Sequence, residues 1–176
     1  MTCFELTIVG PSIDTVGIST ANEVRDVESV DEAIAVMTER LADLNVAHFN
    51  TTIAGIRWPT DTRFDLPTVL EQILTLTRSI LGDVLGSAIL DFYEQGIERR
   101  IRFDRNAGAV LVTEVCESSA CCDIVTTSEF SQMLRELVDT FAILGRQFCP
   151  DYWKLDVVQN WHQSLLEAFR NQCDNE

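Results

Sequence analysis

The chain has 176 residues, of which 46% are hydrophobic and 23% are charged, a composition typical of a folded protein and unlike that of a disordered one. Its 28 acidic residues outnumber its 13 basic residues, and the resulting net charge of −15 repels nucleic-acid phosphates and anionic membrane surfaces. We therefore expect no direct binding to nucleic acid or to a membrane, and one domain over residues 1–176.

The N-terminal segment predicts a strand and no targeting signal. Phe4, Leu6 and Ile8 alternate with less apolar residues, which is typical of a half-buried strand ending at Gly10. No basic segment precedes this run, and no apolar run reaches the length of a membrane span. We expect a cytoplasmic protein with reduced thiols. A further short strand is expected over residues 23–27.

The first helix carries one apolar and one acidic stripe. Ser29 and Glu32 have the spacing of a capping box, in which each side chain satisfies a free backbone donor. The apolar stripe consists of Val30, Ile34, Met37, Leu41 and Leu44. Glu32, Glu39 and Asp43 fall on the opposite face. They form either a docking surface for cations or an ordinary solvated face.

Residues 47–57 are rich in β-branched and aromatic types and predict one strand, which Trp58-Pro59 ends. We expect Trp58 to be the most exposed tryptophan, a type of residue that is common as an interface anchor, and we include it among the partner-binding residues; a rim residue that covers the core is the favoured alternative. A second helix is predicted from Asp65, which could cap it, to Gly82. Residues 83–95 favour a strand.

A hairpin is predicted at about 97–115. Residues 97–103 alternate apolar with charged types, residues 104–108 have the length of a turn that contains glycine, and residues 109–115 return. The hairpin carries the basic cluster of the chain: Arg99, Arg100, Arg102 and Arg105. These arginines either pair with acids on neighbouring strands or form an anion site.

The last third of the chain predicts two helices. Thr126 and Glu129 repeat the capping-box pattern before a helix that runs to Phe148. Pro150 suits the start of a final helix. The core side of that helix is expected to contain Trp153, Val157, Trp161, Leu165 and Phe169. Because the break between the helices is tight, we expect an antiparallel helical hairpin.

These elements together predict an α+β fold. We expect an antiparallel or mixed sheet with a central hairpin, packed by four main helices and ending in an antiparallel two-helix hairpin.

The sequence contains no standard catalytic, nucleotide-binding or metal-binding motif. Cys116, Cys121 and Cys122 form an irregular cluster, to which Cys149 and His162 could add ligands. Buried or incidental thiols are the favoured interpretation. We predict no catalytic residue, cofactor or metal, and a protein that is not an enzyme.

Several features resemble bacterial immunity proteins, which neutralise toxins in contact-dependent inhibition and related polymorphic systems. These features are the size, the acidic charge, the hairpin with Phe103-Asp104 before its turn, and the two-helix ending around Phe148-Cys149-Pro150 and Trp161. The resemblance covers about the C-terminal half of the chain and includes no diagnostic motif, so it assigns no functional residue. It implies a small cytoplasmic α+β protein that blocks a toxin.

We therefore predict a protein that binds and neutralises a basic protein partner, such as a nuclease-like toxin. Complementary charge speeds the encounter of such partners, although excess acid can also serve solubility alone. Glu32, Glu39, Asp43 and Trp58 are the predicted partner-binding residues. One alternative is a non-catalytic module that binds a small molecule or assembles, for example as a homo-oligomer. The other is an enzyme without a readable motif that uses His48, His162 or a cysteine.

Overall fold

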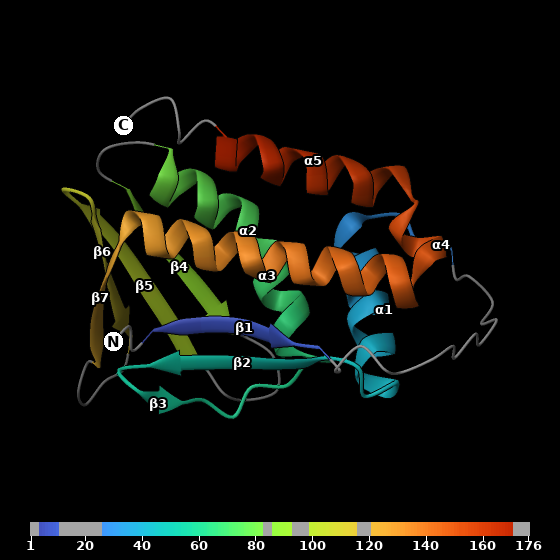
Figure 1. The fold of residues 1–176 in the computed structure, drawn as a ribbon, viewed down its shortest axis with the longest axis horizontal. Coiled ribbons are helices and arrows are strands. Elements are labelled where there is room, and N and C mark those ends of the chain that lie inside the picture. Colours follow the sequence, from blue (N-terminus) through green and yellow to red (C-terminus); the bar gives the residue numbers. More distant parts are fainter. Residues whose placement is uncertain (1–3, 11–25, 83–85, 93–98, 116–120, 171–176) are drawn as a thin grey trace.

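Helices and strands are mixed along the chain, and the last three described elements are helices (Figure 1). The computed structural model describes residues 4–10, 26–82, 86–92, 99–115 and 121–170. Within these residues the strands are β1 (Glu5–Val9), β2 (His48–Ile53), β3 (Ile56–Arg57), β4 (Ser87–Phe92), β5 (Arg99–Asn106), β6 (Ala109–Glu114) and β7 (Cys122–Thr126). The helices are α1 (Val30–Asp43), α2 (Asp65–Leu81), α3 (Thr127–Phe148), α4 (Pro150–Trp153) and α5 (Asp156–Arg170).

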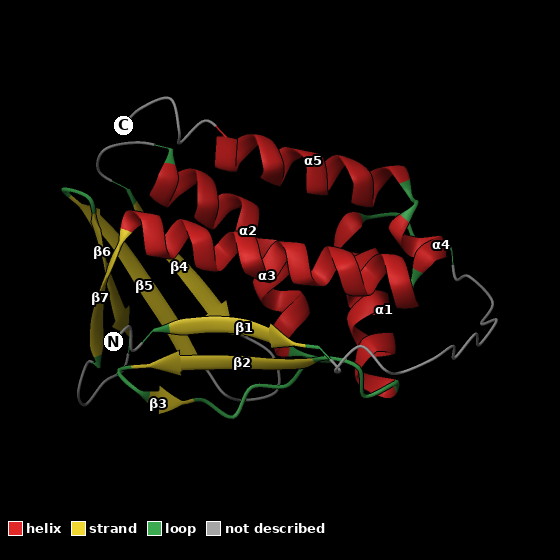
Figure 2. Ribbon diagram, viewed as in Figure 1, coloured by secondary structure: helices red, strands yellow, loops and turns green. Residues whose placement is uncertain are grey.

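The described strands form two antiparallel sheets, which confirms the predicted α+β class. The first sheet has the order β1-β2-β3 and the second has the order β4-β5-β6-β7. Figure 2 shows the helices on one side of both sheets. The predicted strand at 23–27 lies largely outside the described residues, and Asp26 and Val27 are not in a strand.

Residues 47–57 form a hairpin, so the prediction of one continuous strand is wrong. Ala54 and Gly55 have φ angles of 50° and 74°, which is the geometry of a two-residue hairpin turn. Ile53 and Ile56 pair across this turn. An Ala-Gly pair gives a weaker turn signal than Asn-Gly or Asp-Gly, because alanine rarely adopts a positive φ. Because the residues on both sides favour a strand, the turn between them was not predicted.

The predicted hairpin at 97–115 is present, and its turn lies later than expected. Ala107 and Gly108 are the turn residues, with φ angles of 44° and 84°. Asp104 and Asn106 continue β5 and pair with Leu111 and Ala109 of β6. The strand predicted within residues 83–95 is confirmed as β4 over residues 87–92. Strand β7 was not predicted.

Both predicted capping boxes are found, with one difference. The Ser29 hydroxyl accepts from the backbone N–H of Glu32, but the Glu32 carboxylate accepts from Glu28, one residue before the cap. The second box is complete, because Thr126 and Glu129 satisfy each other's backbone donors. In contrast, Asp65 does not cap α2.

The Asp65 carboxylate accepts from the backbone N–H of Asp61, and the N-cap position of α2 is held by Phe64 without a side-chain bond. Gly82 follows the last turn of α2 in right-handed helical conformation, with φ −73°, so it does not supply the left-handed stop typical of glycine.

The predicted final helix is two helices, α4 and α5, with a turn at Lys154 and Leu155 between them. This turn changes the phase of the apolar pattern, so that Val158 is buried and Val157 is exposed, the reverse of what one continuous helix predicts. Trp153 and Trp161 thus belong to different helices, yet both pack edge-on against Phe141 of α3.

Helices α3 and α5 run antiparallel in Figure 1, in agreement with the predicted helical hairpin. Arg135 of α3 stacks on Phe169 of α5, with its guanidinium carbon 5.2 Å from the ring centre. The buried side chains of both sheets and of all five described helices form one hydrophobic cluster.

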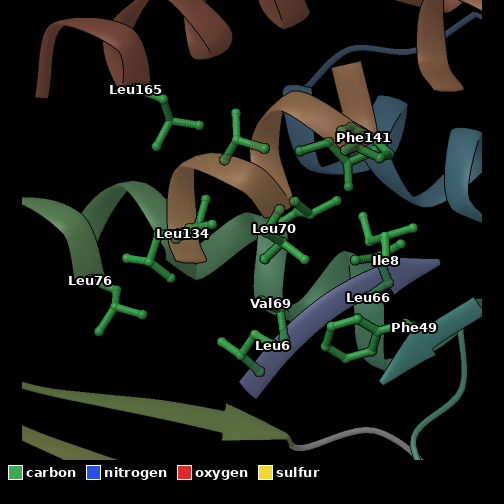
Figure 3. Packing of buried hydrophobic residues seen from close by; sticks show 14 of the residues in the cluster. Leu6, Ile8, Phe49, Leu66, Val69, Leu70, Leu76, Leu134, Phe141 and Leu165 are labelled. Atoms are coloured by element: carbon green, nitrogen blue, oxygen red, sulfur yellow. The ribbon is translucent and has the colours of Figure 1, made fainter. Parts of the chain in front are cut away.

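Helix α2 lies in the middle of this cluster. Figure 3 shows Leu66, Val69 and Leu70 of α2 between Leu6 of β1 and Leu134 of α3. Helix α2 also packs against α1.

Candidate functional site

Two acidic side chains of α1 lie towards the segment that leads into α2. Arg63, in that segment, is paired with both Glu39 and Asp43. The Glu39 carboxylate lies 3.6 Å from a guanidinium nitrogen of Arg63. These pairs are partly exposed to solvent, and pairs of that kind contribute about 0–1 kcal/mol to folding.

A groove of about 420 Å³ lies between α1 and α2. Its charged lining consists of Asp26, Glu32, Glu39 and Glu71 and a single base, Arg63. Its other lining residues are mainly apolar: Val27, Ala35, Val36, Phe64, Pro67 and Thr68. We call this feature the α1–α2 groove.

The chemistry of the α1–α2 groove suits the side chain of lysine or arginine. Such a side chain carries a long apolar stem, which could lie on Val36 and Pro67, and a cationic head, which the carboxylates could hold. Two of the predicted residues, Glu32 and Glu39, line the groove. Asp43 does not line it and is connected to it through Arg63.

Trp58 is not exposed, so the prediction that it is a surface anchor is wrong. Its side chain is 3% exposed and meets the ring of Phe92 edge-on at 5.6 Å. The guanidinium of Arg99 stacks on the indole at 4.7 Å. The chain reverses at Ala54-Gly55, and β3 therefore delivers Trp58 to the junction of the two sheets instead of to a free strand end.

Two of the four hairpin arginines pair with acids, and one of these pairs joins neighbouring strands, as one of the two interpretations expected. Arg100 bonds Asp91 on the neighbouring strand at 2.8 Å, and Arg102 bonds Asp104 on its own strand at 2.8 Å. The Arg102 bond lowers the pKa of Asp104, and the same bond raises the pKa of Arg102. Arg105 donates to the carbonyls of Ile80 and Leu81 at the end of α2.

Cys149 and His162 are both partly or fully buried among the described residues. Burial raises the pKa of Cys149 to about 11, so its thiol stays protonated at neutral pH. Burial also lowers the pKa of His162, whose ring packs on Trp153 at 5.2 Å. His48 is exposed at the start of β2.

Cys116, one member of the predicted cysteine cluster, lies outside the described residues. Cys121 precedes β7, and Cys122 is the first residue of that strand. The described part of the chain contains no group of three histidine, cysteine or acidic side chains placed to hold a metal ion.

Sequence reasoning missed Asp26, Arg63 and Glu71 as members of the site. Arg63 belongs to the loop before α2 and Glu71 belongs to α2 itself, and nothing in the local pattern relates either residue to α1. Only the packing of α1 on α2 brings them to Glu32 and Glu39.

Within the described residues, no helix combines the length and the apolar character needed to cross a membrane. Comparison with known protein families, with curated proteins and with solved structures finds no match for this chain.

Proposed function

We propose that the protein binds a basic protein partner and blocks its activity, as an immunity protein does in the cytoplasm of a bacterium. The observation that carries this proposal is the α1–α2 groove, whose lining combines four carboxylates and one arginine with an apolar floor. The proposal assigns no catalytic step to the chain.

The proposed mechanism is occlusion of a cationic site on the partner. A lysine or arginine of that site enters the α1–α2 groove, lays its stem on the apolar floor and pairs its head with Glu32 and Glu39. A nuclease-like partner would normally use the same cation to hold a phosphate. While the cation is paired with carboxylates, that phosphate is excluded.

The net charge of −15 supports fast capture of such a partner. A strong negative field raises the rate at which a positively charged protein arrives, and dissolved salt screens this attraction. The proposed complex therefore forms faster at low ionic strength, while the contacts in the groove set how long it lasts.

The first experiment is capture of partners from lysate of the source cells at low and moderate salt, followed by mass spectrometry and an activity assay of each captured protein. We expect one stoichiometric basic protein whose activity falls when this chain is added. A partner whose activity is unaffected by the chain would contradict the proposal.

A charge-matched pair of variants locates the interface. Replacing Glu32, Glu39 and Asp43 together with lysine reverses the charge of α1. Replacing Asp139, Asp151 and Glu167 with lysine makes the same change of net charge on exposed positions of α3, α4 and α5. We expect only the first variant to lose inhibition of the partner; equal loss in both would remove the α1–α2 groove from the interface.

A further inference from the structure

One face of the second sheet carries apolar side chains but no described helix. Figure 2 shows the described helices on the other side of this sheet, where Phe103 and Val112 are fully buried. Because successive residues of a strand point to opposite faces, the neighbours of these two residues point outward. Four large apolar side chains on the outward side are between 39% and 74% exposed: Ile89, Leu111, Val115 and Ile124.

The strand register arranges this surface, which we call the outer sheet face, in three rows across the strands. Directly paired residues of an antiparallel sheet point to the same face. The last row ends at Val115, whose backbone N–H donates to the carbonyl of Arg100 at 2.9 Å. From β4 towards β7, the first row is Ser87, Asp104, Leu111 and Ile124, the middle row is Ile89, Arg102, Thr113 and Cys122, and the last row is Asp91, Arg100 and Val115.

The charges in these rows cancel. Asp91 pairs with Arg100 and Asp104 pairs with Arg102, each at 2.8 Å, whereas the chain as a whole carries a net charge of −15. Two copies of so acidic a chain repel one another, and this repulsion is smallest where two neutral faces meet. A basic partner, in contrast, finds no excess of negative charge in these rows. The charge therefore favours a second copy of the chain as the occupant of the outer sheet face.

The rows are also complementary to themselves. A two-fold axis that crosses the strands along the middle row exchanges the first and last rows, so that each contact occurs twice. This symmetry sets Leu111 of each copy opposite Val115 of the other. Ile89 lies on the middle row and meets Ile89 of the second copy. Apolar side chains thus face apolar side chains.

The same symmetry matches the charges. Arg100 lies in the last row and Asp104 in the first, both on β5, so each faces the other across the two copies. Arg102 lies on the middle row and meets Arg102 of the second copy, and its bond to Asp104 neutralises each of them. Both charge and apolar pattern therefore fit an interface between identical faces.

We propose that the outer sheet face binds the same face of a second copy of this chain, as two sheets packed face to face. Packed sheets lie about 10 Å apart, and the apolar side chains of both copies fill that space. Four short strands give a small interface of the weak, transient class, so we expect a dissociation constant on the order of 0.1 mM. The α1–α2 groove shares no residue with this face, so the proposal does not depend on the function proposed above.

The test is a dilution series of the full chain from about 1 mM to about 10 μM, on either side of the expected dissociation constant. Sedimentation equilibrium measures the mass, and NMR follows the isoleucine methyl groups. We expect a dimer at the highest concentration, and methyl shifts at Ile89 and Ile124 but not at Ile143, which is 58% exposed on α3. Added salt should tighten the dimer because it screens the repulsion between two acidic chains, whereas it weakens capture of a basic partner.

A matched pair of variants locates the interface. Ile89→Lys places two like charges opposite each other at the two-fold axis and should weaken the dimer at least about tenfold. Ile143→Lys makes the same change at an exposed position of α3 and should leave the dissociation constant nearly unchanged. Thermal unfolding at low micromolar concentration, where the chain is a monomer, checks that both variants fold.

Three outcomes would overturn the proposal. A monomer at 1 mM, at both low and high salt, would show that the face does not bind a second copy. Concentration-dependent shifts at Ile143 without shifts at Ile89 and Ile124 would place self-association on another surface. Equal weakening by the two lysine variants would assign the effect to net charge and not to the outer sheet face.

Discussion

The α1–α2 groove and the hairpin face of the second sheet are both charged, and they differ in where the charged side chains lie. On the hairpin, Arg100 and Arg102 each bond an aspartate at 2.8 Å on the sheet surface. In the groove, four carboxylates and one arginine, Arg63, surround apolar lining residues. A cluster of like charges in a sequence therefore indicates a candidate binding surface where the fold arranges it around a groove. By this criterion the acidic groove is the candidate site and the arginine cluster is structural.

The largest predicted effect concerns the part of the core that lies beside Arg99. Trp58→Ala removes a buried side chain that packs on Phe92 and carries the guanidinium of Arg99. We expect the free energy of unfolding to fall by about 3–5 kcal/mol, the usual cost of such a cavity. Chemical denaturation measures it, with Trp58→Phe as a milder control. A loss below about 1 kcal/mol would mean that Trp58 is not a core residue in solution.

The next effect tests whether Arg63 competes with a partner's cation. Arg63→Gln removes the single base of the α1–α2 groove, and we expect association with a basic partner at low salt to accelerate roughly threefold. Arg170→Gln, at the exposed end of α5, makes the same change of net charge and serves as the control. If both variants accelerate equally, the effect comes from net charge and not from the groove.

A smaller effect tests by titration whether Arg102 pairs with Asp104. Because Arg102 lowers the pKa of Asp104 below 3.8, Asp104 stabilises the fold above that pH, and this contribution is lost as the pH falls through the lowered value. Arg102→Gln should move the Asp104 pKa back towards 3.8, as NMR titration of the carboxyl carbon can measure. An unchanged Asp104 pKa would show that the bond to Arg102 does not persist in solution.

The smallest effect is expected for Arg100→Ala. The side chain is about half exposed, and a surface pair of this kind contributes about 0.2–1 kcal/mol to stability. Urea denaturation of the variant and of the wild type at low and high salt measures this contribution. A loss above about 2 kcal/mol would contradict the interpretation of Arg100 and Asp91 as an ordinary surface ion pair.

Local patterns in the sequence predicted much of the fold. The Ser29 and Thr126 caps, the apolar stripes of α1 to α3 and the alternation in β5 each follow from neighbouring residues, so they could be recognised without a structure. The turn at Ala54-Gly55 and strand β7 were missed because their local signals are weak: Ala54 is an unusual turn residue, and Ile124 of β7 is largely exposed.

The candidate site was predicted only in part, for a different reason. Glu32 and Glu39 could be recognised because they share a face of one helix, whereas Arg63 and Glu71 join them only through the packing of two helices. The burial of Trp58 likewise depends on Phe92 and Arg99, which are distant in sequence. Contacts between elements leave no periodic signal in a single sequence.

The most direct test of the central claim is the salt dependence of the association rate, measured by stopped flow with the basic partner. The α1–α2 groove and the net charge together predict a rate for the wild type that falls steeply as salt rises. The lysine variant of Glu32, Glu39 and Asp43 should associate more slowly at low salt than the charge-matched variant of Asp139, Asp151 and Glu167. Equal rates for these two variants at every salt concentration would contradict the claim that the α1–α2 groove is the binding site.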